Sequence, residues 1–512
     1  MLNSSVRAKK PWWGLLGLAL GLVHFPATDA DAASVSTLFA FDLHVPSSTV
    51  VEGSGSNQGF LFGTTYDTSL SYGGAIYKVP VSGGAPEIVY QLQSTDGYAP
   101  QSPLLRSTDG YLYGTTRYWP RIGAQTAAGT GTIFRIAQDG TGYTTLHTFA
   151  AIDHIDATTG AAINTDGFYP DQALIEDGTY LYGVTPSGGD YGMGTVFRIR
   201  KSDNTFEAIY SFPLPDDTTA GTNSAGIGNQ PAAALTLGSD GRLYGVTRNG
   251  GLYAKTSGVT GVSVSSVGTG TIFALDKDGN NFESLHSFSA LDDTDTGSGT
   301  NSDGVQPQGS LLEVNPGIFI GTTSDGGMPI DTTYTSRGAG TIFEYNVATN
   351  VLTTLYNFDL ANGSAPLGQL ILGTDRLVYG TTIGGAAGSS PVTSYGVIYS
   401  LDPAAPADTG FSQVHAMTFA EGGGITGGVI QASDGDLYGV STYGNACTEI
   451  NGNGYGAVFR YSLTTNASVT GYANCTPLRT NSGGGSMSPG TLWLLGILGL
   501  APPVRRRLFG VQ

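Results

Sequence analysis

One short phrase, an apolar pair followed by glycine and two threonine- or valine-like residues, recurs seven times along the 512 residues. Its copies are Leu61–Thr65, Leu112–Thr116, Leu181–Thr185, Leu243–Thr247, Phe319–Thr323, Val378–Thr382 and Leu437–Ser441. The glycines of successive copies lie 51, 69, 62, 76, 59 and 59 residues apart. Repetition at this scale indicates an array or a propeller, because each copy is one supersecondary unit that needs its neighbours for burial.

Each copy is the second of four short apolar segments. In one unit these are Gln230–Leu235, the phrase itself after an Asp240–Gly241 turn, Gly270–Leu275 and Leu285–Phe288. Asp-Gly between apolar runs is a hairpin signal, since glycine accepts a positive φ without a steric clash. Four antiparallel strands in each of seven units predict an all-β fold, a seven-bladed β-propeller of four-stranded antiparallel blades.

The seventh unit lacks its fourth segment. After Ala457–Tyr461 only the polar stretch Thr464–Asn466 follows, whereas an unmatched apolar segment, Thr37–Phe41, lies near the start of the chain. We therefore expect the N-terminal strand to complete the last blade and to close the ring, which removes an open sheet edge. The alternative is an open solenoid with an unpaired first strand.

Composition excludes several other classes. With 78 glycines and 12% charged residues, the chain is unsuited to a long helical protein. Its 40% hydrophobic content argues against intrinsic disorder. A net charge of −18 disfavours nucleic acid and anionic lipid as partners.

The N-terminus has the three-part pattern of a secretory signal peptide. Basic residues precede the apolar run Pro11–Phe25, and small residues follow it. We predict a signal peptide over residues 1–32, cleaved by signal peptidase between Ala32 and Ala33. An uncleaved anchor is the alternative, although the run is short for a membrane span.

The C-terminus carries a second export pattern. We assign residues 33–466 to the propeller, 467–486 to a tail with a glycine-rich cleavage region, and 487–512 to a transmembrane anchor. The anchor contains the apolar run Met487–Val504, about 27 Å long as a helix, just enough to span a bilayer. The flanking sorting residues are Gly483, Gly484, Gly485, Arg505, Arg506 and Arg507.

This order of glycine cluster, apolar helix and arginine cluster resembles the GlyGly-CTERM sorting signal of Gram-negative bacteria. The resemblance implies cleavage by a rhombosortase-like protease and transfer to the cell surface or release. A plain C-terminal anchor is the alternative. The repeated phrases resemble the GloVer tandem repeat of secreted bacterial proteins with a choice of C-terminal anchors. That resemblance implies surface display and supplies no catalytic residues, and the long insertions of this chain depart from it.

Histidines give no catalytic signal. His147, His286 and His415 occupy a repeat position that other units fill with tyrosine or phenylalanine, so we interpret them as packing residues in separate blades. The sequence contains no Gly-x-Ser-x-Gly, His-Glu-x-x-His or P-loop motif.

One insertion is rich in the hard oxygen ligands that calcium prefers. We predict a calcium site there, with a solvated acidic loop as the alternative, and expect no other cofactor. Its candidate ligands are Asp292, Asp293, Asp295 and Asp303, with Asn301 nearby. Two other insertions have similar clusters with fewer or more widely spaced oxygen ligands: Asp153, Asp156, Asn164 and Asp166 in one, and Asp216 and Asp217 in the other.

Cys447 and Cys475 are the only cysteines, and both lie in the part expected to be exported. We expect a disulfide between them because that compartment is oxidising. Two free thiols are the alternative.

For function, we expect non-enzymatic binding or adhesion at the bacterial surface, with a saccharide or protein ligand, through loops on a rigid scaffold. Aromatic candidates for the contact are Tyr118, Trp119, Tyr191, Tyr253, Tyr334 and Tyr443. The alternative is an exported polysaccharide hydrolase or lyase that uses Asp171 at the channel mouth. Other units have glutamine or proline at the position of Asp171, and these uncharged residues favour a structural channel. They are Gln101, Gln230, Gln306 and Pro366.

Overall fold

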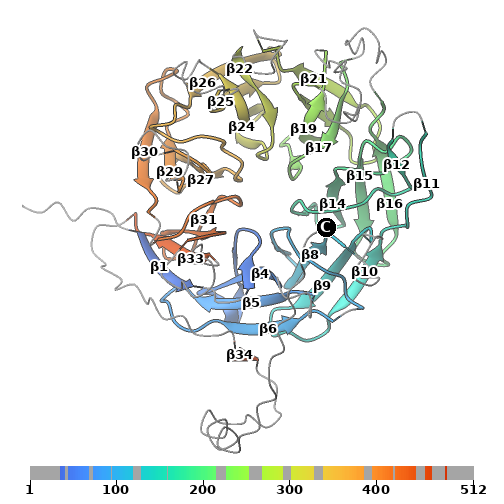
Figure 1. Cartoon of the computed structure of the whole chain (residues 1–512), viewed down its shortest axis with the longest axis vertical. Helices are drawn as coiled ribbons and strands as arrows, with labels where there is room; N and C mark the ends of the chain where they lie inside the picture. Colours follow the sequence, from blue (N-terminus) through green and yellow to red (C-terminus); the bar gives the residue numbers. More distant parts are fainter. Residues whose placement is uncertain are drawn as a thin grey trace, which may run out of the picture.

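Seven antiparallel sheets stand side by side around a central axis and form a closed β-propeller (Figure 1). The computed structural model describes residues 35–40, 44–67, 73–93, 95–118, 129–157, 160–214, 226–252, 268–291, 301–327, 338–385, 395–418, 421–444, 456–463 and 479–480. Within these ranges no helix is long and apolar enough to cross a membrane. The fold class predicted from the seven repeated phrases is confirmed.

The blades follow the repeats in order, each with its first strand near the axis and its fourth at the rim. The first three blades contain β2 (His44–Pro46), β3 (Val51–Glu52), β4 (Phe60–Asp67), β5 (Ala75–Pro80) and β6 (Glu87–Gln91); β7 (Leu105–Arg106), β8 (Tyr111–Thr116), β9 (Thr132–Ala137) and β10 (Thr144–Thr148); and β13 (Ile175–Glu176), β14 (Tyr180–Thr185), β15 (Thr195–Arg200) and β16 (Phe206–Ser211).

The next three blades contain β17 (Gly228–Pro231), β18 (Thr236–Leu237), β19 (Leu243–Gly250), β20 (Thr271–Leu275) and β21 (Glu283–Ser287); β22 (Asn301–Pro307), β23 (Leu312–Asn315), β24 (Ile318–Gly327), β25 (Thr341–Asn346) and β26 (Val351–Asn357); and β27 (Ile371–Leu372), β28 (Val378–Thr381), β29 (Val397–Leu401) and β30 (Phe411–Ala416). Outside the blades lie a 3-10 turn, η1 (Gly55–Asn57), and a hairpin of β11 (His154–Ile155) and β12 (Ala162–Ile163). A short strand, β34 (Arg479–Thr480), pairs in parallel with β6.

The seventh blade joins the two ends of the ring. It contains β31 (Val429–Gln431), β32 (Leu437–Ser441) and β33 (Ala457–Tyr461), and its fourth strand is the N-terminal β1 (Val35–Ala40). β1 pairs antiparallel with β33, from Val35 opposite Tyr461 to Ala40 opposite Ala457. Leu38 and Phe39 are buried in the core between the seventh and first blades. The predicted closure is therefore confirmed, and Figure 1 shows the blue strand β1 beside the orange-red β33.

The glycine of the repeated phrase makes room for an aromatic ring on the third strand. Gly183 lies opposite Phe197 in the register of β14 and β15, and a Cβ added there would overlap the Phe197 ring. The same contact joins the phrase glycine to Phe or Tyr of the third strand in the other six blades. This close approach explains why the phrase requires glycine at a position with ordinary strand dihedrals.

The tyrosine of the phrase closes the preceding turn. The Tyr182 hydroxyl donates a 2.9 Å hydrogen bond to Asp177, and Tyr113 does the same to Asp109. Three more blades repeat this pair, through Tyr244 and Asp240, Tyr379 and Asp375, and Tyr438 and Asp434. The two remaining copies of the phrase have phenylalanine or isoleucine at this position and no Asp-Gly turn before it. The Asp-Gly turns are thus structural, as expected from the sequence.

Alternating strand direction brings all long connections to one face of the ring. The loops after the second and fourth strands of each blade emerge on the same side, because neighbouring strands are antiparallel. We call this side the loop face. The four long insertions, at residues 151–167, 216–228, 252–269 and 291–303, follow second or fourth strands in the sequence, whereas the opposite side carries the short Asp-Gly turns.

Removal of β1 tests the closure. A variant that lacks residues 35–40 loses the strand partner of β33 and the buried Leu38 and Phe39, so we expect its cooperative thermal transition to be lost. Leu38→Ala, which keeps the strand, should cost about 2–5 kcal/mol of unfolding free energy. Calorimetry and circular dichroism measure both, and a deletion variant that melts like the intact protein would contradict ring closure.

A buried hydroxyl on the third strand of the sixth blade offers a stabilising substitution. Tyr399 is fully buried, its hydroxyl has no hydrogen-bond partner within the described ranges, and five other blades have phenylalanine at this position. We expect Tyr399→Phe to raise the unfolding free energy by about 1 kcal/mol, since a buried unsatisfied polar group costs about 1–3 kcal/mol. The matched reverse change, Phe343→Tyr in the neighbouring blade, should lower it. Denaturant titration measures both, and a destabilised Tyr399→Phe variant would refute this account.

Candidate functional site

A pocket of about 270 Å³ lies on the propeller axis, and residues from all seven blades line it. In the fourth and fifth blades the lining residues directly follow Pro231 and Pro307, which pair with Thr247 and Thr323 at the loop-face end of the second strand, so the pocket lies towards the loop face. Half of the sixteen lining residues have side chains that are neutral donors or acceptors. The polar lining residues are Ser47, Ser48, Gln101, Asp171, Gln172, Gln308, Ser310, Gln369 and Thr426.

A proline-containing turn delivers these side chains to the axis. In five blades the innermost segment contains a proline, which ends β17 and β22 in two of them, and the residue before it has a positive φ, for example 63° at Tyr169 and 55° at Gln230. The residue after the proline then lines the pocket, as Gln101 and Asp171 do.

This geometry corrects the sequence alignment in three blades. The pocket is lined by Ala232, Gln308 and Leu367, which follow the proline. Gln230, Gln306 and Pro366 do not line it. The Gln230 side chain instead accepts a 2.6 Å hydrogen bond from Asn249. The alignment was wrong because sequence similarity alone did not reveal that the residue after the proline reaches the pocket, whereas the positive-φ residues Gln230 and Gln306 and the proline Pro366 do not.

Asp171 is the only carboxylate among the described lining residues, and it is ion-paired. One Nη of Arg117 lies 3.1 Å from Asp171 Oδ2 and 3.2 Å from Gln101 Oε1. Burial raises the pKa of Asp171, while the Arg117 charge partly opposes that shift. Gln172 donates a 3.1 Å hydrogen bond to the other carboxylate oxygen.

Aromatic rings enclose the Arg117 guanidinium on the loop face. Its central carbon lies 5.6 Å from the Tyr118 ring centre and 5.3 Å from that of Tyr169. The two rings meet edge to face at 5.2 Å, and Tyr98 lies 6.2 Å from Tyr118. Sequence reasoning found Tyr118 and Asp171 but missed Arg117. Its position directly after a repeated phrase was the available signal.

Other predicted loop aromatics lie apart from this group. Tyr191 is exposed, and Tyr443 packs on the glycines of its own blade, Gly423 and Gly424. Trp119, Tyr253 and Tyr334 lie outside the described residues.

The three histidines pack as expected and also form hydrogen bonds that the sequence analysis missed. His147 stacks on Phe206 with ring centres 3.7 Å apart. Its Nε2 lies 2.9 Å from Asp166, a residue of the loop that leads to the next blade. His286 with Asp303 and His415 with Glu421 repeat this pair, each at 3.2 Å. A carboxylate downstream of each histidine was the signal in the sequence.

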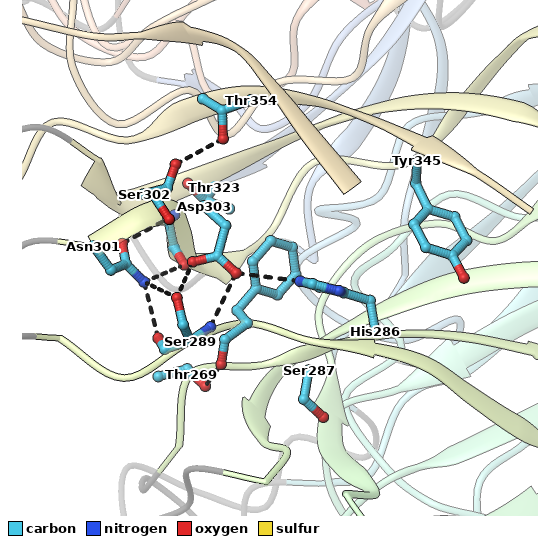
Figure 2. Close-up of polar contacts among 12 residues, drawn as sticks. Thr269, His286, Ser287, Ser289, Asn301, Ser302, Asp303, Thr323, Tyr345 and Thr354 are labelled. Atoms are coloured by element: carbon cyan, nitrogen blue, oxygen red, sulfur yellow. Dashed lines mark hydrogen bonds and ion pairs between the residues drawn. The ribbon is translucent and has the colours of Figure 1, made fainter. Parts of the chain in front are cut away.

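Asp303, one of the predicted calcium ligands, is engaged by protein donors (Figure 2). Its oxygens accept hydrogen bonds from the Ser289 amide, at 3.0 Å, and from the Ser289 hydroxyl, besides the contact with His286. Asn301 closes the same loop through Ser289 and Gly304. The second cluster behaves alike, since Asn164 and Asp166 bind their own loop.

The calcium site stays a prediction. Asp292, Asp293 and Asp295 lie outside the described residues, as do Asp216 and Asp217. Among the residues that are described, no three His, Cys, Asp or Glu side chains gather as a metal site would require. Also outside the described ranges are Cys447, Cys475, Ala32, Ala33, the glycines 483–485 and the arginines 505–507.

Acid titration tests the histidine–carboxylate pairs. Burial alone would raise the pKa of Asp303, but hydrogen bonds from His286 and Ser289 outweigh burial and lower it. A carboxylate with a lowered pKa stabilises the fold above its unfolded pKa of about 4, and this stabilisation is lost as the pH falls further. Asp303→Asn should therefore reduce stability at pH 6 and flatten its decline below pH 4.

Urea unfolding between pH 2.5 and 6 measures this effect. Asp153→Asn is the matched control, because Asp153 is exposed and its side chain forms no hydrogen bond with the described residues. If Asp303→Asn and Asp153→Asn show the same pH profile, the pair makes no contribution.

Comparison with known proteins supports the repeat. Residues 263–496, somewhat less than half of the chain, match the Gloeobacter/Verrucomicrobia repeat family. No curated protein matches the sequence.

Several solved structures are similar in outline. The extracellular domain of a protein described as a one-component system from B. thetaiotaomicron shares 10% identity at a TM-score of 0.42, and the match covers 83% of this chain and 39% of that one. Oligogalacturonate lyase from Vibrio parahaemolyticus shares 8% at 0.43, over 84% and 94%. Periplasmic gluconolactonase from Pseudomonas aeruginosa shares 13% at 0.40, over 84% and 100%.

The chain thus spans 39% of the length of the first of these proteins. All three likenesses are too distant to carry an argument about activity. What the comparisons establish is narrower: the chain contains a bacterial-type tandem repeat, and residues 263–496 are similar to the Gloeobacter/Verrucomicrobia repeat.

Proposed function

We propose that this chain is an exported, non-enzymatic propeller that binds a saccharide in the axial pocket on its loop face. The observation that carries the proposal is the lining, where neutral amides and hydroxyls from different blades surround one Arg117–Asp171 ion pair. Sugar hydroxyls both donate and accept hydrogen bonds, and amide and hydroxyl side chains offer both functions. A volume of about 270 Å³ suits one or two sugar rings, near the small end of the usual range for ligand pockets.

The aromatic group beside the pocket supports the same ligand class. Tyr98, Tyr118 and Tyr169 present ring faces and edges next to Arg117, which gives the pocket mouth an apolar flank beside its polar lining. A ligand with alternating C–H and O–H surfaces can satisfy both parts. Tyrosine loses little conformational entropy on binding, which makes it suited to such a contact.

Hydrolysis is less well supported by this lining. Glycoside hydrolysis commonly uses two carboxyl groups about 5–10 Å apart. The described lining supplies Asp171 alone, and that carboxylate is paired with Arg117. The raised pKa of Asp171 would suit a proton donor, so turnover is measured in the same experiment as binding.

Export rests on the two terminal patterns and agrees with the position of the first strand. Cleavage after Ala32 would leave two residues before β1, which begins at Val35. The mature chain would then start with the strand that completes the ring. Retention at the surface or release depends on the predicted processing near residues 483–485.

Two substitutions in the pocket test the proposal. Arg117→Gln removes the charge that joins Asp171 to Gln101, and we expect about a tenfold loss of saccharide affinity, because hydrogen bonds to charged groups contribute about 1.5–3 kcal/mol. Asp171→Asn keeps the side-chain shape and should weaken binding less. A glycan array identifies ligands, and calorimetry on the purified protein measures the affinities.

The control is Asp402→Asn, a carboxylate in the short turn after β29 on the opposite face, which should bind as the unaltered protein does. Melting temperatures of all variants report whether the fold is intact. A hydrolysis or lyase assay on the bound glycans runs in parallel. Turnover that Asp171→Asn abolishes would overturn the non-enzymatic proposal in favour of the polysaccharide enzyme.

A further inference from the structure

The residue that follows each repeated phrase occupies one repeat position, at the loop-face end of the second strand. In the seven blades these residues are Tyr66, Arg117, Pro186, Arg248, Ser324, Ile383 and Thr442. Two of them are arginines, in a chain that has only 22 lysines and arginines in total. The second and fourth blades supply them, on either side of the blade that supplies Asp171.

Two blades show where a side chain at this position goes. Arg117 reaches Gln101 of its own blade and Asp171 of the next blade. Ser324 accepts a 2.9 Å hydrogen bond from Gln308 of its own blade. Since Gln101, Asp171 and Gln308 all line the pocket, this repeat position contacts the lining in both blades.

Arg248 has the same backbone setting as Arg117. Arg117 follows Thr116, which lies opposite Thr132, the first residue of the third strand. In the same way, Arg248 follows Thr247, which lies opposite Thr271. A Cβ built on Gly131 would lie 3.1 Å from the carbonyl oxygen of Arg117. A Cβ built on Gly270 would lie at the same distance from the carbonyl oxygen of Arg248. Arg248 therefore lies at the mouth of the pocket, on the blade that contributes Ala232.

The surroundings of Arg248 differ from those of Arg117 in one respect, which is the lack of an acceptor. Ala232 replaces the glutamine of the second blade and cannot accept a hydrogen bond. On the next blade, the neutral Gln308 replaces the aspartate, and its amide nitrogen donates to Ser324, so this position of the blade offers no carboxylate to Arg248. Arg248 is exposed and forms no ion pair or side-chain hydrogen bond with the part of the chain that the structure describes. The pocket mouth thus has an uncompensated positive charge beside a neutral polar lining.

We infer that the axial site takes an acidic saccharide, a sugar ring with a carboxylate, and that Arg248 receives the carboxylate. This inference rests on the proposed saccharide binding. Arginine suits the role because its planar fork matches the two oxygens of a carboxylate. The one carboxylate of the lining, Asp171, is already neutralised by Arg117 and leaves Arg248 free for the ligand.

Matched pairs of sugars test the inference on the purified protein. The probes are glucose with glucuronate, galactose with galacturonate, and mannose with mannuronate, which differ within each pair only at C6. Calorimetry should show tighter binding of the acid in at least one pair. Arg248→Gln should weaken that acid about tenfold, as expected for the loss of a charged hydrogen bond, and leave the neutral partner unchanged.

Arg376→Gln is the control variant, because Arg376 is exposed in a turn after β27 on the opposite face and loses the same charge. It should leave every affinity unchanged. Oligouronates in the same titration distinguish the sources, since tighter binding than the monomer indicates a polysaccharide and equal binding indicates a free sugar acid.

The possible failures are distinguishable. If neutral and acidic sugars bind equally and Arg248→Gln changes neither, the acidic-ligand inference is wrong and saccharide binding stands. If no sugar of the panel or of the glycan array binds, the proposed function itself fails.

Discussion

The pairing of β1 with β33 is the constraint on which the rest of the molecule depends. A propeller blade buries its two faces against its neighbours, so a ring with one incomplete blade would expose both a core surface and a sheet edge. Here the N-terminal strand β1 meets β33, the third strand of the seventh blade, in one sheet, and Leu38 and Phe39 lie in the core between the seventh and first blades. The axis, and everything that points towards it, is fixed by this closure.

Closure converts a linear repeat into a site. Each blade alone places only a few side chains near the axis, and a single amide or hydroxyl binds nothing selectively. Side chains from all seven blades around one axis enclose a pocket in which no two neighbours need to be the same. The scaffold positions are kept by glycine, tyrosine and phenylalanine contacts that recur in the blades, whereas the axial positions vary from serine to glutamine, aspartate, alanine and leucine. Repetition thus supplies the geometry, and variation at the repeated position supplies the chemistry.

Much of the fold was predictable because it is encoded locally. The phrase glycine lies against the aromatic ring of the adjacent strand, and the phrase tyrosine bonds an aspartate four or five residues before it. Such short-range partners leave a periodic trace in the sequence. The site was only partly predictable for the opposite reason. Asp171 was found as a channel residue, but its partner Arg117 is 54 positions away and in another blade.

The errors and omissions have the same origin. Gln230 and Gln306 resembled pocket residues, yet these positive-φ residues before the proline do not line the pocket, whereas Ala232 and Gln308 do. Asp303 is a predicted calcium ligand, and that site stays a prediction, but its bonds with His286 and Ser289 were an omission. In each case the residue type was read correctly, and its partners were set by a loop conformation.

By itself the sequence determined the number of blades, the four strands in each, the Asp-Gly turns and the closing role of the N-terminal segment. These follow from hydrophobic periodicity and turn residues, which act over a few neighbouring positions. Only the tertiary structure decided which side chains meet at the axis, that Asp171 is neutralised by Arg117, and that Arg248 has no such partner among the described residues. Those facts depend on how separate blades are placed around one ring, and contacts between blades leave no local pattern in the chain.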